Sequence, residues 1–275
     1  MTLNKVKQRE AAMLATINTL WIGKLTRLEK VCLSSFLFHG HQVNVYSYQD
    51  LEGLPEGIKQ KDANEIIPES EIFYYGRSAR KGRGSVAGFA NRFRYELLKN
   101  SANSYWVDTD VLALKPFSLN AELDFGWESN KLINNAVIGT KSPNHELFNT
   151  LSNACESPFK IQPWDNVKVK YKKVRAKLHK NSTEFMPWGL TGPKALTGAV
   201  KELKLQHLTS PYYTYYPVSY ANASLIFESS KQLVIPDEAK SIHLWNEVLR
   251  RDGIDKDNKF KSDSIYEKWA TKLGY

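Results

Sequence analysis

The sequence contains little cysteine: Cys32 and Cys155 are the two among 275 residues. They lie far apart and belong to no CxxC motif or Cys/His cluster, so they predict neither a disulfide framework nor a zinc site. This usage is typical of a reducing compartment, and we expect a cytoplasmic protein.

A long apolar run is also missing. The uncharged run at residues 11–23 follows Lys5, Lys7 and Arg9, an order that only faintly imitates a signal peptide. Asn18 and two threonines interrupt this run, and it is shorter than the ~20 apolar residues that a membrane-spanning helix needs. We therefore expect neither secretion nor a transmembrane helix.

Several motifs of common enzyme classes are absent. No GxGxxG follows the first apolar run, and the chain has no P-loop and no GxSxG elbow. The dinucleotide-binding, P-loop and α/β-hydrolase interpretations therefore lose their usual support. The sequence also has no internal repeat and no low-complexity tract.

The composition is that of a packed globular protein. Hydrophobic residues make up 42% and aromatic residues 12% of the chain, while the mean hydropathy of -0.46 indicates a strongly polar surface. The length suits one large domain, and a single α/β domain is the first choice. The 38 basic against 29 acidic residues give a net charge of +9, which favours phosphate-bearing partners or an anionic membrane face.

The order of apolar segments predicts an α/β fold. Strands are expected at 17–22, 42–48, 105–107, 123–127 and 131–139, with a small one at 72–75, and helices at 25–39, 85–99, 143–155 and 193–203, with a short one at 62–67. The opening strand, helix and strand form a βαβ unit. Such a unit predicts parallel neighbours and ligands at the carboxyl ends of the strands.

Two carboxylates follow the central strand directly. If the backbone stays extended, Asp108 and Asp110 point to one side and Thr109 to the other. Like charges this close repel each other unless a cation neutralises them, and Mg²⁺ or Mn²⁺ suits hard carboxylate oxygens. We expect a bound divalent metal ion that coordinates a diphosphate.

The helix at 85–99 offers further candidates. Its apolar stripe leaves Asn91 and Arg94, three residues apart, together on another face. Arg94 is either a ligand for phosphate or for Asp108, or an ordinary surface arginine. The glycine-rich loop at 76–88 before this helix is either a plain exposed loop or a lid over a phosphate site, and its cations are Arg77, Arg80, Lys81 and Arg83.

A basic segment covers residues 168–180. Val167, Tyr171, Val174 and Leu178 fall on one helical face there. Either this apolar face covers the core, or the helix is attracted to an anionic leaflet or a lipid-linked phosphate. The basic residues are Lys168, Lys170, Lys172, Lys173, Arg175, Lys177 and Lys180.

Two later segments carry residues that either line a site or have a structural role. Trp188 begins a tight turn that ends at Pro193, and its ring either lines a sugar or base pocket or belongs to the core. His243 lies beside Leu244, Trp245 and Asn246 and either completes a metal shell or is structural.

Four blocks in order resemble the DXD sugar-nucleotide glycosyltransferases, especially bacterial relatives of family 32, which are related to capsular and lipopolysaccharide glycosyltransferases and to glucosylating toxins. The blocks are 20–23 with Ser34, Phe36, Gly40 and His41; 89–95 followed by 105–117; 188–193; and 243–246. The likeness spans nearly the whole chain.

The resemblance implies a single GT-A domain over residues 1–275, with a Rossmann-like, mainly parallel sheet and a largely helical acceptor-side region at 156–240. It implies a UDP-sugar donor, a divalent metal, Mn²⁺ rather than Mg²⁺, and transfer of a hexose with retention to a saccharide or glycolipid acceptor. Surface polysaccharide or glycolipid synthesis would be the setting, with peripheral contact to the inner face of the membrane and no nucleic acid as partner.

Site roles follow from the same resemblance. Asp110, Asp108 and His243 would bind the metal, and Arg94 and Asn91 would act beside the donor sugar. Trp21, Ile22, Tyr48 and Asn135 would contact the nucleotide sugar, and Trp188, Gly192 and Trp245 would lie on the acceptor side. The family usually has aspartate where Asn91 stands, and an amide accepts a hydroxyl bond but supplies no charge.

Two other functions stay open. A phosphatase of the haloacid-dehalogenase type also has DxD after a strand, but its motif has threonine or valine where Leu112 stands. A non-enzymatic protein that binds nucleic acid or membrane through residues 168–180 would depend on salt and not on the carboxylates.

Overall fold

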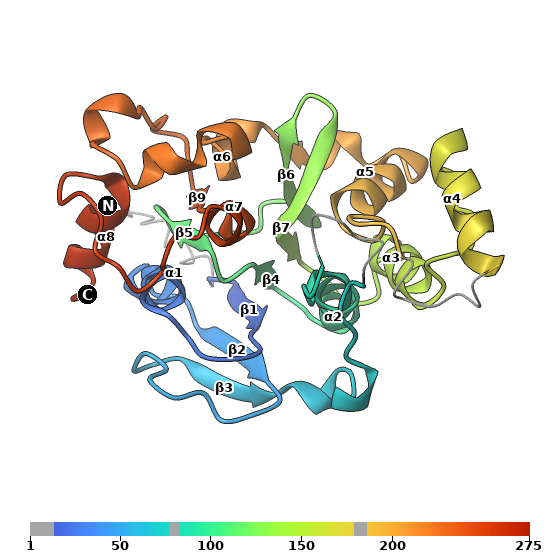
Figure 1. Cartoon of the computed structure of the whole chain (residues 1–275), viewed down its shortest axis with the longest axis horizontal. Helices are drawn as coiled ribbons and strands as arrows, with labels where there is room; N and C mark the ends of the chain where they lie inside the picture. The colour runs from blue at the N-terminus through green and yellow to red at the C-terminus, as the bar shows by residue number, and fades with distance from the viewer. Residues whose placement is uncertain (1–13, 77–82, 179–185) are drawn as a thin grey trace, which may run out of the picture.

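The structure is a computed structural model that describes residues 14–76, 83–178 and 186–275 (Figure 1). Its centre is a seven-stranded sheet in the order β3-β2-β1-β4-β7-β6-β8. The strands are β1 (Thr16–Leu20), β2 (Val43–Ser47), β3 (Lys59–Asp62), β4 (Ser104–Val107), β6 (Leu123–Ser129), β7 (Leu132–Thr140) and β8 (Thr209–Ser210).

The sheet is mixed and mainly parallel. Strands β3, β2, β1 and β4 run parallel to one another, β7 runs antiparallel to β4 and β6, and β8 pairs with β6 in parallel. The fold class predicted from the sequence, a Rossmann-like mixed sheet of GT-A type with flanking helices, is therefore confirmed.

Helices cover both faces of this sheet, because α1 lies on one side and α2, α3 and α5 lie on the other (Figure 1). Strand β4 carries an apolar run because both of its faces are covered. Tyr105 and Val107 pack into the cluster on the α1 side, and Trp106 packs into the cluster on the α2 side. The helices are α1 (Arg27–Phe38), α2 (Ala87–Lys99), α3 (Glu146–Glu156) and α5 (Pro193–Glu202).

The C-terminal part of the chain packs on α1. Strand β5 (Val111–Ala113) pairs antiparallel with β9 (Ser241–His243) in a separate two-stranded sheet. A third apolar cluster joins this pair to α1 and to the helices that follow. These helices are α7 (Asn246–Arg251) and α8 (Ile265–Lys272). Helix α6 (Tyr212–Tyr215) precedes β9, and its Tyr215 packs into the cluster on the α1 side of the main sheet.

One local prediction fails and one strand was not expected, because side-chain pattern was a poor guide there. Residues 72–75 form no strand and instead follow the 3-10 helix Glu69–Glu71. Strand β3 was not expected, because all four of its side chains are exposed and polar, and only its backbone pairs with β2. The short helix expected at 62–67 is the 3-10 helix Ala63–Glu65, whose first turn is capped by the Asp62 side chain, 2.8 Å from the amide of Asn64.

The basic segment forms helix α4 (Val167–Leu178) at the edge of the molecule (Figure 1), and Lys180 lies outside the described residues. Of the two alternatives left open for this segment, the one in which its apolar face covers the core is wrong. Val167, Tyr171, Val174 and Leu178 are exposed, whereas Lys173 and Ala176 are buried.

The remaining described elements between residues 156 and 240 are mainly short 3-10 helices: Gln206–Leu208, Tyr220–Ile226 and Ser230–Gln232. Within the described part of the chain, no helix is both long and apolar enough to span a bilayer. Lys5, Lys7 and Arg9, which precede the uncharged run, and the loop cations Arg77, Arg80 and Lys81 lie outside the described residues.

Candidate metal centre and cavity

The two carboxylates of the DxD motif lie in a turn that joins β4 to β5. Asp108 donates its backbone N–H to the Ala136 carbonyl at 2.8 Å, and Val111 N–H closes the turn on the Asp108 carbonyl at 3.1 Å. The extended backbone assumed from the sequence is therefore wrong. The carboxylates nevertheless meet, because each offers an oxygen within 4.8 Å of the other and of a His243 nitrogen.

His243 reaches this turn through the register of the β5–β9 pair. Val111 lies opposite His243 in that pair, which places the imidazole Nε2 3.2 Å from Asp110 Oδ2. Trp245 then takes the left-handed conformation, with φ 59° and ψ 58°, a rare one for a bulky residue. This bend directs the N–H of Asn246 back to Asp110 Oδ2 at 2.7 Å.

Arg94 holds the other carboxylate. Its Nη2 donates to Asp108 Oδ1 at 2.8 Å, its Nη1 donates to the Asn135 carbonyl, and its guanidinium lies 4.8 Å from the centre of the Trp106 ring. Trp106 Nε1 donates to the same Asp108 oxygen at 2.7 Å. Because Arg94 is only 4% exposed, it is no ordinary surface arginine.

The three groups titrate unlike free side chains. Burial raises the pKa of Asp108, an effect that Arg94 opposes and the neighbouring Asp110 increases. Burial also acts to raise the pKa of Asp110, but the charge and hydrogen bond of His243 outweigh it, so that this pKa is lowered. Burial acts to lower the pKa of His243, whereas Asp110 outweighs this and raises it. The cluster thus favours one positive charge beside Asp110.

The donor set fits a divalent cation. Carboxylate oxygens suit Mg²⁺ and Mn²⁺, and the imidazole of His243 offers a nitrogen ligand beside them. His243 Nδ1 is buried and has no hydrogen-bond partner among the described residues. One nitrogen of this ring is therefore left for a ligand.

These groups open onto a cavity of about 930 Å³. Of the candidates, Trp21, Ile22, Arg94, Asp108, Asp110, Trp188, His243 and Trp245 line it. Trp188 thus lines the cavity and also packs against a small buried cluster, where its ring centre lies 4.8 Å from that of Tyr75. Of the cationic loop at 76–88, Arg83 and Gly84 line the same cavity.

Asn91 and Asn135 lie together behind Arg94 and outside the cavity lining. Asn135 Nδ2 donates to Asn91 Oδ1 at 2.8 Å, and Asn91 Nδ2 donates to Thr191 Oγ1 at 3.2 Å. Gly192 leaves the space that this network needs, since a Cβ there would lie 3.1 Å from Asn91 Nδ2. Tyr48 lies elsewhere, with its hydroxyl donating to the Ile67 carbonyl at 2.8 Å.

Sequence reasoning missed a further ion pair at the cavity, between Glu29 and Lys256. Glu29 is buried in α1, where its carboxylate caps the helix at Thr26 and also pairs with Lys256. The Lys256 ammonium lies 5.1 Å from the centre of the Trp21 ring and lines the cavity. The Thr26-x-x-Glu29 spacing is a capping-box signal that would have located the carboxylate, but no local signal pointed to Lys256.

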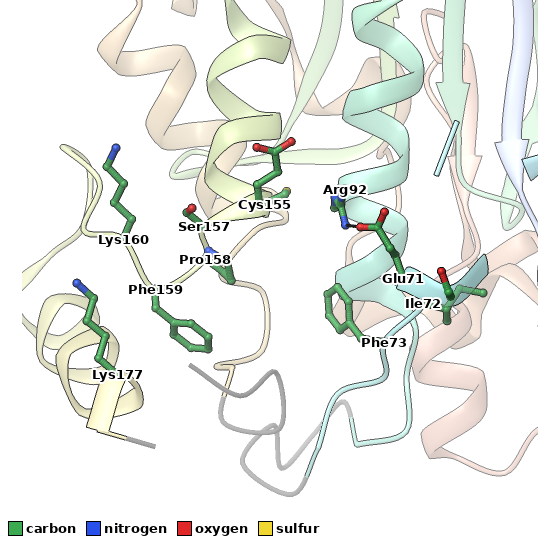
Figure 2. A pocket seen from close by; sticks show the side chains of 12 residues that line it. Glu71, Ile72, Phe73, Arg92, Cys155, Ser157, Pro158, Phe159, Lys160 and Lys177 are labelled. Atoms are coloured by element: carbon green, nitrogen blue, oxygen red, sulfur yellow. Dashed lines mark hydrogen bonds and ion pairs between the residues drawn. The ribbon is translucent and has the colours of Figure 1, made fainter. Parts of the chain in front are cut away.

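A second cavity, of about 630 Å³, lies between the end of α3 and the segment before α2 (Figure 2). Arg92 Nη1 pairs with Glu71 Oε2 at 2.6 Å on one wall, and Lys160 and Lys177 lie on the opposite side. The described residues that line it include Lys177 of the basic segment but none of the candidate metal, donor or acceptor residues, so this cavity is separate from the carboxylate cluster.

Comparisons with known proteins give distant likenesses only. No family model and no curated protein matches the chain. Among solved structures, the chain is similar to a "PaToxG Glycosyltransferase", with 11% identity, a TM-score of 0.43 and coverage of 96% of this chain and 88% of that chain. It is also similar to a structure described as a transferase mutant, with 12% identity, a TM-score of 0.35 and coverage of 63% and 91%. Both TM-scores are low, and neither likeness serves to assign an activity here.

Proposed function

We propose that this chain is a metal-dependent retaining glycosyltransferase that moves a hexose from a UDP-sugar to a hydroxyl of a saccharide or glycolipid acceptor, in surface polysaccharide or glycolipid synthesis. One observation carries the proposal: Asp108, Asp110 and His243 converge at the wall of a 930 Å³ cavity at the end of a central strand. The DXD pattern in the sequence supports the same assignment.

Asp108, Asp110 and His243 would hold the divalent cation, Mn²⁺ rather than Mg²⁺. When bound, this ion supplies positive charge against the diphosphate leaving group. Arg94 fixes the orientation of Asp108, because its guanidinium is itself held by the Asn135 carbonyl and the Trp106 ring.

The cavity walls suggest where the donor lies. Trp21 and Ile22 offer an apolar surface for the base, and the cations Lys256 and Arg83 line the same cavity and would attract the phosphates. We assign Trp188, Gly192 and Trp245, with residues 156–240, to the acceptor side. Asn91, Asn135 and Tyr48 remain proposed contacts of the nucleotide sugar.

Transfer needs no dedicated base in this proposal. The bond between the anomeric carbon and the donor phosphate oxygen breaks, and a bond to the acceptor oxygen forms on the same face. The hydroxyl proton passes to the departing phosphate oxygen. The chain's own contribution is to orient the reactants, exclude water and stabilise the developing negative charge.

The phosphatase alternative fits the geometry less well. Its nucleophile would be Asp108, but one oxygen of that carboxylate accepts hydrogen bonds from both Arg94 and Trp106. Such bonds stabilise the carboxylate charge and weaken the group as a nucleophile.

The test is a thermal-shift and donor-hydrolysis assay with several UDP-hexoses, with and without Mn²⁺. Saturation at about 100 times Kd adds ~2.7 kcal/mol, which raises Tm by roughly 5–10 °C for a chain of this size. Asp110→Asn should abolish this shift, and the matched control Asp237→Asn, which changes an exposed carboxylate outside the cavity lining, should keep it.

Each other outcome favours a different function. Phosphate release from a monoester, lost in Asp108→Asn, would replace the transferase by a phosphatase. No response to any UDP-sugar or monoester, with or without metal, would leave a binding protein.

A further inference from the structure

Helix α4 has its apolar side chains on the outside. Val167, Tyr171, Val174 and Leu178 are 83%, 66%, 50% and 80% exposed. An α-helix turns by about 100° per residue, so these four positions lie within an arc of roughly 60°. Lys173 and Ala176, the buried residues of α4, lie on the opposite side of the helix.

The inward side of α4 is fixed by specific contacts. Lys173 Nζ lies 2.7 Å from Asp165 Oδ2 and donates to the Lys160 carbonyl at 2.9 Å, and both side chains of the pair are 3% exposed. Just before the helix, Trp164 packs so closely on Gly198 of α5 that a Cβ there would lie 2.2 Å from the indole. The apolar row therefore points outward because the opposite face is occupied.

Exposed cations border the apolar row on both sides. With the same rotation of about 100° per residue, Lys170 and Lys177 lie on one side of the row. Lys168 and Arg175 lie on its other side. No acidic residue occurs between Val167 and Leu178. An apolar strip between two rows of basic side chains is the pattern of a helix that lies in a membrane interface, where the long side chains reach the headgroups.

We propose that α4 is a membrane-docking helix, and that its occupant is the surface of an anionic lipid bilayer. The apolar row would enter the boundary of the acyl chains, and the flanking cations would contact lipid phosphates. A second copy of the chain is a poor occupant, because it would bring two sets of cations together. Nucleic acid needs the cations but not the apolar row. This inference goes beyond the proposed activity and does not depend on it.

The experiment is vesicle flotation of the full chain, with vesicles of phosphatidylcholine alone or mixed with phosphatidylglycerol. We expect binding to the mixed vesicles and little to the neutral ones. Lys170→Gln with Arg175→Gln should lower the partition coefficient roughly 25-fold, about five-fold for each cation. Tyr171→Gln with Leu178→Gln should lower it at least ten-fold, and Gln keeps the helix propensity high.

Two matched controls separate docking from general effects. Val234→Gln removes an equally exposed apolar side chain outside α4, and Lys59→Gln with Lys61→Gln removes two exposed cations on β3. Both should float like the parent protein. Circular dichroism confirms that each variant is folded.

Several results would overturn the inference. One is a parent protein that binds neither kind of vesicle. Another is a Tyr171→Gln, Leu178→Gln variant that floats like the parent, above all if the parent also binds duplex DNA as tightly as the vesicles. Because flotation needs no substrate, loss of the proposed transferase activity would leave this result unaffected.

Discussion

Adjacent lysines in α4 should respond very differently to the same substitution. Lys173 is buried against Asp165, whereas Lys172 is exposed. Methionine has a similar length and helix propensity to lysine, so Lys173→Met and Lys172→Met differ mainly in the environment of the lost charge. The first leaves Asp165 buried without its cation, and the second removes a solvated charge.

The magnitude follows from the burial of the pair. Removal of one partner of a buried ion pair costs about 3–5 kcal/mol, and here the Lys160 carbonyl also loses its donor. At 1.4 kcal/mol for each factor of ten, the opening equilibrium of α4 should rise roughly 100- to 4,000-fold in Lys173→Met. This free-energy cost falls on α4 alone and not on the whole fold, because opening of α4 by itself is enough to return the Asp165 carboxylate to water.

Hydrogen exchange of the α4 amides measures this opening directly. We expect a large loss of protection in Lys173→Met, parent-like exchange in Lys172→Met, and partial recovery in Lys173→Met with Asp165→Asn, whose amide oxygen can still accept from Gln162 N–H, as Asp165 Oδ2 does at 2.7 Å. Equal exchange in the two lysine variants would refute the orientation of the helix, and the docking surface with it.

Three further predictions concern the site and the core. Arg94→Lys should lower kcat in UDP-hexose hydrolysis at least ten-fold, because lysine cannot contact the Asn135 carbonyl and Asp108 as a planar fork does. Asn91→Asp should lower the free energy of unfolding by about 1–3 kcal/mol in urea titrations, because a carboxylate replaces a buried amide, and should change the preference among UDP-hexoses. Burial lowers the pKa of His41, so the free energy of unfolding should fall as the pH drops below about 6.5, the pKa of the unfolded chain. His41→Gln should flatten this pH dependence, measured by urea titrations at pH 7.5 and 5.5.

Contrary outcomes are as definite. Unchanged kcat in Arg94→Lys would mean that Asp108 needs no oriented partner, and a stable Asn91→Asp with the parent donor preference would remove this network from donor recognition. The sign for His41 rests on its burial, which lowers the pKa, and on Nε2, which accepts from Phe117 N–H at 2.8 Å and loses this bond when protonated. The bond of Nδ1 to the Ala15 carbonyl, at 2.8 Å, acts in the opposite direction. A steeper decline with acid in His41→Gln would contradict the predicted sign.

Local pattern predicted the sheet well where side chains are buried. The βαβ opening and β4, β6 and β7 follow from apolar runs, whereas β3 escaped notice because it is held by backbone pairing alone. For α4, periodicity identified one apolar face but could not say which face is covered. That choice is made by Asp165, which takes Lys173 inward.

Only part of the candidate site could be predicted from the sequence. Asp108 and Asp110 are neighbours in the chain, so their spacing was enough to suggest a cation site. The approach of His243 depends on the pairing of β5 with β9 and on the bend at Trp245, and the contact of Lys256 with Glu29 joins segments 227 residues apart. Such long-range contacts leave no mark in local periodicity.

The pairing of β5 with β9 also has a consequence for biosynthesis. Asp110 receives the Asn246 N–H from a residue 136 positions later, so this carboxylate lacks that hydrogen bond until β9 and the start of α7 have left the ribosome. At about 5–20 residues per second, translation of that interval takes roughly 7–27 s. A nascent chain arrested before β9 should therefore have strands β1, β2 and β4 paired but lack His243 from the group formed with Asp108 and Asp110, and this group should assemble in one late step.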